Sequence, residues 1–434
     1  MPSIQMSDPI KVAIDAAIIP DGHEGGVEQF ITGLVHSLGR LNDPSFEYII
    51  VGSWQNPRWL EPHLGPNQRI LPIPTPPQEA SAYHRLLRKL YRRRKRCSNQ
   101  ALPAPAGRWI DRLLAQADYT SVLNDFYDKL KADVVHFPHQ NTRHQVRVTV
   151  FNPHDLQHLH FPEFFTHQQI QLRETVYRRA CRHARAIVAE SLWVKNDLIR
   201  NYAVGPEKIF VVYRGSPTEW YGDVTEAVVR KLKEKYDLDQ PFALYPAQTW
   251  PHKNHLRLLA AIHRLNALHG IRLKLVCTGK KNDFWPAIAD RTRDLGLQNQ
   301  VVFTGYILSE ELKALYRLAQ FVVVPSLCEG GGFPVLEGFH QGTPVTCADT
   351  TALPEYGGDA VLLFDPQSVD SMAAALHRMA TDRQLLTELA QKGRVRIRRF
   401  SWKNTAEAYQ ALYKQVAGRP LVDEECHILE QCTH

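Results

Sequence analysis

Short apolar runs alternate with amphipathic stretches along most of the chain. The first pair is an apolar run at residues 10–15 and a stretch at 27–40 in which Phe30, Leu34 and Leu38 recur every four residues. This spacing places the three side chains on one face of a helix, whereas the run before them is typical of a buried strand. Because strand and helix patterns keep alternating, the sequence predicts a parallel α/β fold.

The alternation forms two series that are joined by a polar segment at residues 217–240. The first series has predicted strands at residues 10–15, 46–51, 134–136, 148–151, 186–188 and 209–212. The second has predicted strands at residues 242–245, 274–277, 301–303, 321–324, 344–346 and 360–362. We therefore expect two Rossmann-like domains that face a central cleft.

The expected domain boundaries follow from these series. The first domain is predicted over residues 1–216 and the second over residues 217–398. Residues 399–434 begin with a helical stripe that includes Trp402 and Tyr409 after Ser401, a residue type that often caps helices. The tail from Gly418 fits no regular pattern, so we expect it to be loose.

Residues 52–120 interrupt the first series and are predicted to be an insertion. Eight Lys or Arg residues lie between Arg85 and Arg96 without an acidic residue among them. The whole chain carries a net charge of +7, and without these eight cations it would carry −1. The basic character is therefore local, which argues against a nucleic-acid surface over the whole protein.

The basic stretch has the pattern of an amphipathic helix. Its apolar stripe is formed by Tyr83, Leu86, Leu87, Leu90 and Tyr91, and cations occupy the other faces. Such a helix suits an anionic membrane surface or an anionic acceptor, which would meet Arg92, Arg93, Arg94 and Arg96. A solvated helix that packs on the domain is the alternative, and few aromatic side chains interleave with the cations as single-stranded nucleic acid would need.

The composition is that of a globular protein. Of 434 residues, 44% are hydrophobic and 22% charged, and no apolar run is long enough to span a membrane. The first residues lack the pattern of a signal peptide, so we expect a cytoplasmic protein that binds peripherally to the inner face of the membrane. The seven cysteines contain no C-x-x-C pair, which argues against a disulfide framework or a zinc ribbon, and Cys277 and Cys347 are expected in the core.

The densest functional signal follows the predicted strand at residues 321–324. Glu329 is followed by Gly330, Gly331, Gly332 and Phe333, and Glu337 comes eight positions after Glu329. Glycines after a strand allow backbone amides to approach a ligand, and the helix that begins there offers free N–H groups. Two carboxylates at this edge of a sheet are suited to sugar or ribose hydroxyls, although a helix end with a surface glutamate is the plainer alternative.

Other segments decide between these alternatives. The pattern from Glu329 to Glu337 resembles the Glu, seven residues, Glu motif of the retaining glycosyltransferases of family four, which have the GT-B fold. Similar motifs in the second half are Lys253-Asn254, Phe303–Tyr306, Gly342–Val345 and Leu353-Pro354-Glu355 with Gly357. In the first half they are Gly25-Gly26-Val27-Glu28 and His154-Asp155. The resemblance covers residues 10–415 and leaves the 52–120 insertion unmatched.

The resemblance implies roles for individual residues. Lys253 would meet the diphosphate of the donor, and His154 and Glu329 would contact the transferred sugar. Glu337 would bind the ribose, while the glycines from Gly330 to Gly332, Phe333, Gly25 and Gly26 would line the donor site. Members of the family commonly carry an arginine five residues before the lysine, where this chain has Gln248, so Arg214 or His252 is expected to supply a further phosphate contact. His136 and His139 are candidates for the acceptor side.

The implied activity is the transfer of a hexose-type sugar, with retention of configuration, from a UDP-, GDP- or ADP-sugar to an acceptor hydroxyl on a glycan, lipid or small molecule. No cofactor and no metal are expected, since the clustered histidines lack acids at ligand spacing. The alternatives are a nucleotide-sugar epimerase of the same fold and a non-catalytic binding protein. A dinucleotide-dependent oxidoreductase is disfavoured because neither first strand is followed by Gly-x-Gly-x-x-Gly.

Overall fold

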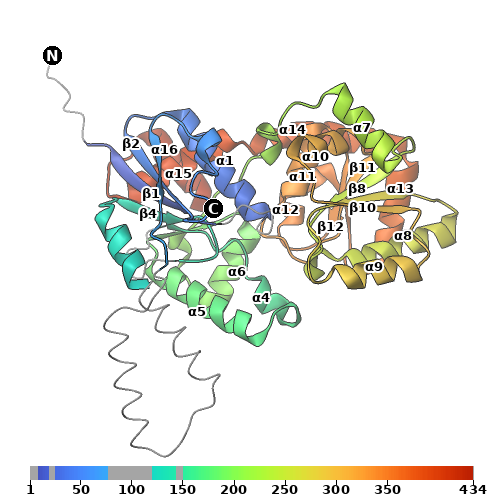
Figure 1. Cartoon of the computed structure of the whole chain (residues 1–434), viewed down its shortest axis with the longest axis horizontal. Helices are drawn as coiled ribbons and strands as arrows, with labels where there is room; N and C mark the ends of the chain where they lie inside the picture. The colour runs from blue at the N-terminus through green and yellow to red at the C-terminus, as the bar shows by residue number, and fades with distance from the viewer. Residues whose placement is uncertain (1–7, 19–24, 77–119, 143–149, 434) are drawn as a thin grey trace, which may run out of the picture.

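The computed structural model describes residues 8–18, 25–76, 120–142 and 150–433. These residues form two parallel β-sheets, each covered by helices, which lie beside one another in Figure 1. The fold is the α/β arrangement of two Rossmann-like domains that the alternating pattern predicts. Among these described residues, we find no helix of the length and apolarity that crossing a bilayer requires.

The first sheet has seven strands in the order β3-β2-β1-β4-β5-β6-β7. The strands are β1 (Ile10–Ala16), β2 (Phe46–Gly52), β3 (Gln68–Pro72), β4 (Val134–Phe137), β5 (Val150–Phe151), β6 (Ala186–Ala189) and β7 (Ile209–Val211). The order reverses between β1 and β4, and ligands of open α/β sheets bind at the carboxyl ends of the strands at such a point.

The second sheet has six strands in the order β10-β9-β8-β11-β12-β13. They are β8 (Phe242–Pro246), β9 (Lys274–Thr278), β10 (Val301–Gly305), β11 (Phe321–Val324), β12 (Val345–Ala348) and β13 (Val361–Phe364). Its order reverses between β8 and β11, whose side chains are almost fully buried in one apolar core. Cys277 and Cys347 lie in that core, as predicted.

The helices that flank these sheets follow the chain in order. In the first domain they are α1 (Gly25–Leu41), α4 (Gln157–His160), α5 (His167–His183) and α6 (Leu192–Tyr202). In the second they are α7 (Glu226–Tyr236), α8 (His255–His269), α9 (Trp285–Asp294), α10 (Ser309–Leu318), α11 (Phe333–Gln341), α12 (Leu353–Gly357), α13 (Val369–Thr381) and α14 (Arg383–Arg396). Helix α7 lies within the polar joining segment and buries Leu232 in the second core.

The last two helices, α15 (Trp402–Val416) and α16 (Asp423–Thr433), pack with the first domain, as the red ribbons beside the blue strands show (Figure 1). The expectation of a loose tail from Gly418 is wrong. Leu429 and Cys432 of α16 are buried in the first core, and Lys195 Nζ donates a hydrogen bond to the Thr433 carbonyl at 2.7 Å. The sequence of α16 is short and begins with three acidic residues, so it does not by itself indicate a buried face. Leu429 and Cys432 are buried because they pack in the same core as α15.

Part of the predicted insertion belongs to the sheet. Residues 68–72 form β3, which pairs in parallel with β2 at the edge, where the Pro72 nitrogen can be tolerated. Residues 77–119, which include Arg92, Arg93, Arg94 and Arg96, lie outside the described residues. The predicted start of the insertion at residue 52 is therefore too early, because residues 68–72 still belong to the sheet.

Trp402 fills the region where the chain crosses between the domains. A Cβ on Gly33 of α1 would lie 2.3 Å from the Trp402 ring, and one on Gly215 after β7 would lie 2.4 Å from it. The Trp402 indole N–H donates to the Ser216 carbonyl at 3.1 Å. The two crossing segments of the chain are thus packed against each other and against α1.

Candidate active site

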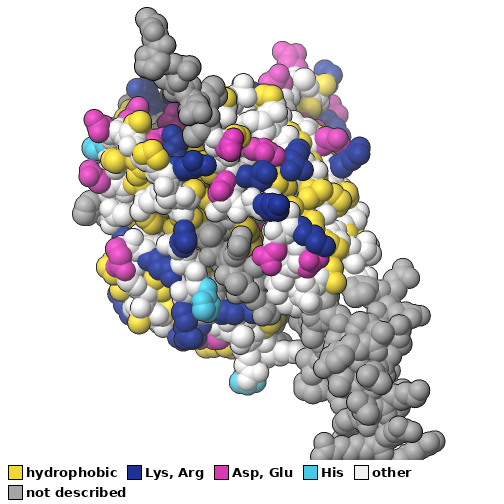
Figure 2. Space-filling view, turned by 90° about the vertical axis from the view of Figure 1, so that its left-hand side faces the viewer, with side chains coloured by type: hydrophobic (Ala, Val, Ile, Leu, Met, Phe, Trp, Pro, Cys, Tyr) yellow, Lys and Arg dark blue, Asp and Glu magenta, His cyan; other side chains and the backbone are white. Residues whose placement is uncertain are grey.

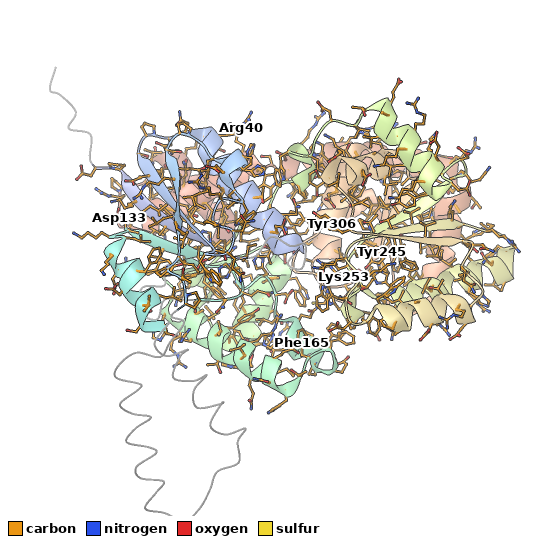
Figure 3. The ribbon with its side chains drawn as sticks, in the orientation of Figure 1. Arg40, Asp133, Phe165, Tyr245, Lys253 and Tyr306 are labelled. Carbon is orange, nitrogen blue, oxygen red and sulfur yellow. The ribbon has the colours of Figure 1, made fainter. Side chains whose placement is uncertain are left out.

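Lys253 and Glu329 come from the two loops that flank the reversal point of the second sheet. Lys253 ends the short turn after β8, and Glu329 follows β11. Because these strands are neighbours and parallel, both loops emerge at the same edge, and Lys253 Nζ lies 2.7 Å from Glu329 Oε1. Both side chains stay partly exposed, at 19% and 13%, so a ligand can reach them. Figure 3 places Lys253, together with Tyr306 after β10, where the two domains face each other.

The glycines after Glu329 approach the first domain closely. A Cβ on Gly330 would lie 2.2 Å from the His154 carbonyl oxygen, and a Cβ on Gly331 would lie 2.2 Å from Arg214 Nη2. Gly332 packs against the Tyr356 ring in its own domain. The lack of a side chain at Gly330 and Gly331 therefore allows the two domains to come into contact, a reason that differs from the predicted approach of a donor.

Glu337 is the fifth residue of α11, about one turn into the helix, and is almost completely buried. Its carboxylate accepts hydrogen bonds from the hydroxyls of Tyr316 at 2.5 Å and Tyr221 at 2.9 Å. Burial raises the pKa of Glu337 to about 7, although the two hydrogen bonds act in the opposite direction. Each carboxylate oxygen can accept one more hydrogen bond, which is compatible with the predicted contact to ribose hydroxyls. That contact stays a prediction.

His154 lies just after β5 and in the left-handed backbone region, at φ 63°. Its Nδ1 lies 2.6 Å from Glu190 Oε1, and its Nε2 lies 3.0 Å from the Pro138 carbonyl. Two acceptors require a ring that is protonated on both nitrogens. Burial would lower the pKa of His154, but the Glu190 carboxylate and the Pro138 carbonyl outweigh burial and the opposing Arg214 charge and raise it. A sugar contact through a ring nitrogen would require His154 to release Pro138.

Arg214 lies after β7 at the same seam between the domains. Its Nη2 is 3.1 Å from Glu190 Oε2, and its guanidinium lies 3.7 Å from the centre of the Phe333 ring. Glu190 is thus shared between two cations. Its burial would raise the pKa of Glu190, but Arg214 and His154 lower it below its usual value. Arg214 is almost fully buried, and its Nε has no hydrogen-bond partner among the described residues.

The other predicted phosphate contacts differ in character. Burial, followed by the neighbouring charge of Lys253, lowers the pKa of His252 well below its usual value, so His252 is neutral and supplies no cation. Gln248, at the position of the missing arginine, faces the first domain, since a Cβ on Gly25 would lie 2.9 Å from Gln248 Nε2. Gly26 faces Phe333 in the same way, at 3.9 Å. The start of α1 therefore meets Gln248 and Phe333 of the second domain.

The two acceptor-side histidines have separate environments. His136 is buried between Tyr413 and Asn152, with 2.7 Å to each, and burial lowers its pKa to about 3. It ties α15 to the first sheet and is fully buried there. His139 lies 3.3 Å from Asp15 at the ends of β4 and β1, which is the reversal point of the first sheet. His139 is also almost fully buried, at 4% exposed, and the predicted acceptor-side role of both histidines stays a prediction.

Glu190 is the residue that the sequence alone does not indicate. It directly follows β6, and an acidic residue at the carboxyl end of a predicted strand is the feature of the sequence by which it could have been recognised. Its partners are 36 and 24 positions away in the sequence, at His154 and Arg214, and only the strand order β5-β6-β7 makes them neighbours. Among the described residues, no group of three or more His, Cys, Asp and Glu side chains is arranged to hold a metal ion.

Two families match the chain. The family "Glycosyl transferases group 1" matches residues 229–396, and the family "Glycosyltransferase Family 4" matches residues 24–220. The second match spans the segment from 52 to 120 that the motif resemblance leaves out. Together the two matches include the second sheet with Lys253 and Glu329, and the first sheet from β2 onward with His154.

Relatives with assigned activities match large parts of the chain. O-antigen chain mannosyltransferase B from Escherichia coli is 28% identical over 310 residues, which are 69% of this chain and 79% of the relative. MMP alpha-(1->4)-mannosyltransferase from Mycolicibacterium hassiacum is 28% identical over 246 residues, which are 56% of this chain and 57% of the relative.

Solved structures share the fold over most of the chain. Anabaena HepE in complex with UDP and glucose superimposes with a TM-score of 0.67 and 17% identity, covering 94% of this chain and 100% of the other. Sucrose-phosphate synthase from Thermosynechococcus elongatus has a TM-score of 0.69 and 18% identity, covering 94% and 99%. At these identities the likeness concerns the fold.

Proposed function

The chain belongs to the group 1 glycosyltransferases and has their GT-B fold, and from this premise we propose that it transfers a hexose-type sugar from a nucleotide-sugar donor to an acceptor hydroxyl with retention of configuration. The observation that carries the proposal is the pairing of Lys253 with Glu329 at the reversal point of the second sheet. A cation and a carboxylate 2.7 Å apart provide one group for a diphosphate and one for sugar hydroxyls.

In the proposed reaction the bond between the anomeric carbon and the diphosphate oxygen breaks, and a bond to the acceptor oxygen forms on the same face. The departing phosphate oxygen takes the proton of the acceptor hydroxyl, so that atoms and charges balance. Lys253 stabilises the negative charge that develops on the diphosphate, with Arg214 as the second cation near the glycine loop. Glu329 and His154 hold the sugar from opposite domains, and Glu337 holds the ribose.

We propose mannose as the first sugar to test, because matched relatives are named mannosyltransferases. The nucleotide of the proposed donor is UDP, GDP or ADP. The acceptor is a glycan, a lipid-linked glycan or a small molecule. The domains are proposed to divide at residues 216/217 and 398/399, where the chain crosses from one sheet to the other.

We further propose that the protein works in the cytoplasm and binds the inner face of the membrane through the basic stretch at residues 85–96. The eight cations of that stretch account for the positive net charge of the chain. Each cation near an anionic bilayer contributes about 1 kcal/mol to binding.

The test is to incubate the full chain with UDP-, GDP- and ADP-hexoses, with and without acceptor glycans, and to identify the products. Transfer predicts release of nucleoside diphosphate that depends on the acceptor, and a product whose anomeric configuration, measured by NMR, equals that of the donor. A changed sugar on the same nucleotide without acceptor would instead indicate an epimerase. Binding of the donor, seen as a raised thermal midpoint without turnover for any acceptor, would indicate a non-catalytic binding protein.

A further inference from the structure

Glu355 belongs to the second domain, but its carboxylate binds the backbone of the first. Its Oε1 accepts a hydrogen bond from the Leu192 N–H at 2.7 Å, and its Oε2 accepts one from the Trp193 N–H at 3.2 Å. Both amides lie in the first turn of α6, where N–H groups have no partner within the helix. The next amide, of Val194, is bound by Ser191 Oγ of its own domain at 3.2 Å. Helix α6 is therefore capped jointly by both domains.

The same carboxylate also contacts the segment that crosses between the domains. The Tyr213 hydroxyl donates a hydrogen bond to Glu355 Oε1 at 2.5 Å. On the side of the second domain, Arg396 holds α12 in place through the carbonyls of Glu355 and Tyr356, both at 2.6 Å. A negative charge at a helix N-terminus is favourable, so this contact stabilises the pairing of α12 with α6.

Two further hydrogen bonds extend this seam to the candidate active site. The Ser191 hydroxyl donates to the Gly330 carbonyl at 3.0 Å, next to Glu329. The Tyr356 hydroxyl donates to the Glu190 carbonyl at 2.7 Å, and the side chain of Glu190 holds His154 and Arg214. The contact between α12 and α6 thus lies beside the groups that the two domains contribute to the site.

We propose that Glu355 is a positioning residue that latches the two domains in the arrangement where Lys253 and Glu329 face His154. Glu355 itself is directed into α6 and Tyr213 and has no part in the proposed donor contacts. Its effect on donor use rests on the proposed function, whereas its effect on the domain contact does not. If only the latched arrangement binds the donor fully, the apparent dissociation constant rises as the latched fraction falls.

The first test measures hydrogen exchange of backbone amides in the full chain without any ligand. In Glu355→Ala the amides of Leu192 and Trp193 should exchange about tenfold faster, because they lose their acceptor and become open to water. The Val194 amide should keep its rate, since Ser191 still binds it. Glu355→Gln retains one acceptor oxygen and should give an intermediate acceleration at Leu192 and Trp193.

The matched control is Glu388→Gln, because Glu388 forms an ion pair with Lys392 of the same helix, within the second domain. In the Glu388→Gln protein, the amides of Leu192 and Trp193 should exchange at the wild-type rate. Unchanged rates at these amides in Glu355→Ala would overturn the latch. An equal acceleration at Val194 would also overturn it, because that result describes a general loss of stability.

The second test uses the transfer reaction. Glu355→Ala should raise KM for the nucleotide sugar about tenfold and leave kcat within about twofold, as expected when a binding-competent fraction is reduced. A fall in kcat at unchanged KM would overturn the positioning role. If no donor supports transfer, the proposed function fails while the exchange measurement still decides the latch.

Discussion

Lys253 of the loop after β8 and Glu329 of the loop after β11 form an ion pair across the reversal point of the second sheet, with 2.7 Å between Nζ and Oε1. The pair satisfies the charge of each side chain within a partly exposed site. It also keeps the ammonium next to the position where sugar hydroxyls are proposed to bind. Lys253 is thus held ready, by a neighbour on another loop, for a negatively charged ligand.

From this pairing we predict that Lys253→Ala lowers turnover by about 10²–10³, the scale of losing one preorganised charge donor. The neutral His252 and Gln248 cannot replace its charge. Lys274→Ala is the control, because Lys274 lies at the opposite end of the second sheet and pairs with Asp237. Steady-state rates with the preferred donor check the prediction. Wild-type rates in a folded Lys253→Ala protein would contradict the assignment.

Glu190 is predicted to stabilise the fold as well as the site. Glu190→Gln leaves buried cations at His154 and Arg214 without their shared carboxylate, which should cost about 3–5 kcal/mol in the free energy of unfolding. Glu174→Gln is the control, since Glu174 also pairs with a histidine, His158, but is more exposed. Urea unfolding of both variants measures the difference. Equal losses in the two variants would contradict the special role of Glu190.

The pH dependence of this loss follows from the directions of the two pKa shifts. The lowered pKa of Glu190 gives stability that is present above its unfolded value of 4.5 and is lost as the pH falls through the folded pKa. The raised pKa of His154 gives stability that is present below 6.5 and is lost as the pH rises through the folded pKa. The difference between wild type and Glu190→Gln should therefore be largest between these two values.

The sequence predicts most of the fold because buried strands and amphipathic helices leave local periodic patterns. The strands at 242–245 and 321–324 are examples, since each is an apolar run bounded by turn residues. Glu329, Lys253 and His154 could also be selected as candidates from the sequence, because each follows a predicted strand in a recognisable motif, and their roles stay predictions. The placement of Lys253 and Glu329 at one edge of the second sheet follows from the parallel pairing of β8 with β11, whereas His154 belongs to the first sheet.

What could not be predicted depends on contacts between segments that are distant in the sequence. The role of Glu190 depends on its ion pairs with His154 and Arg214, and that of Glu355 depends on its hydrogen bonds to the first turn of α6. The glycine triplet predicts a close approach, but the sequence does not tell whether a ligand or another domain approaches. The burial of α16 likewise depends on a surface that α15 creates.

The two carboxylates of the glycine-loop motif are predicted to differ in their kinetic effects. Glu329→Gln should mainly lower kcat, because Glu329 is proposed to hold the transferred sugar. Glu337→Gln should mainly weaken binding of the nucleotide, because Glu337 is proposed to hold the ribose. Calorimetric titration with free nucleotide and steady-state kinetics separate the two. Wild-type affinity of free nucleotide for Glu337→Gln would remove the ribose role.

Glu337 should also make the stability of the protein depend on pH. Its folded pKa of about 7 lies above the unfolded value of 4.5, so burial favours the protonated form. Stability is therefore fully present below pH 4.5 and is lost as the pH rises through about 7, by roughly 3 kcal/mol. Glu337→Gln, which stays neutral, should remove this dependence and exceed the wild type in stability at pH 8. Parallel urea curves for both proteins at pH 5 and pH 8 provide the check.

The last prediction concerns the basic stretch at residues 85–96, which lies outside the described residues. On the face shown in Figure 2, positive and negative side chains are interspersed over the described residues. Because the eight cations at residues 85–96 account for the positive net charge of the chain, attraction to an anionic bilayer should depend on Arg92, Arg93, Arg94 and Arg96. The full chain should bind vesicles that contain anionic lipid, and binding should weaken with salt because the Debye length shrinks from about 10 Å at 0.1 M to about 3 Å at 1 M. Replacing the four arginines with Gln should abolish binding and leave transfer to a soluble acceptor unchanged. If the wild-type chain stays free of such vesicles at low salt, its apolar stripe packs within the protein and the acceptor is not presented by a membrane.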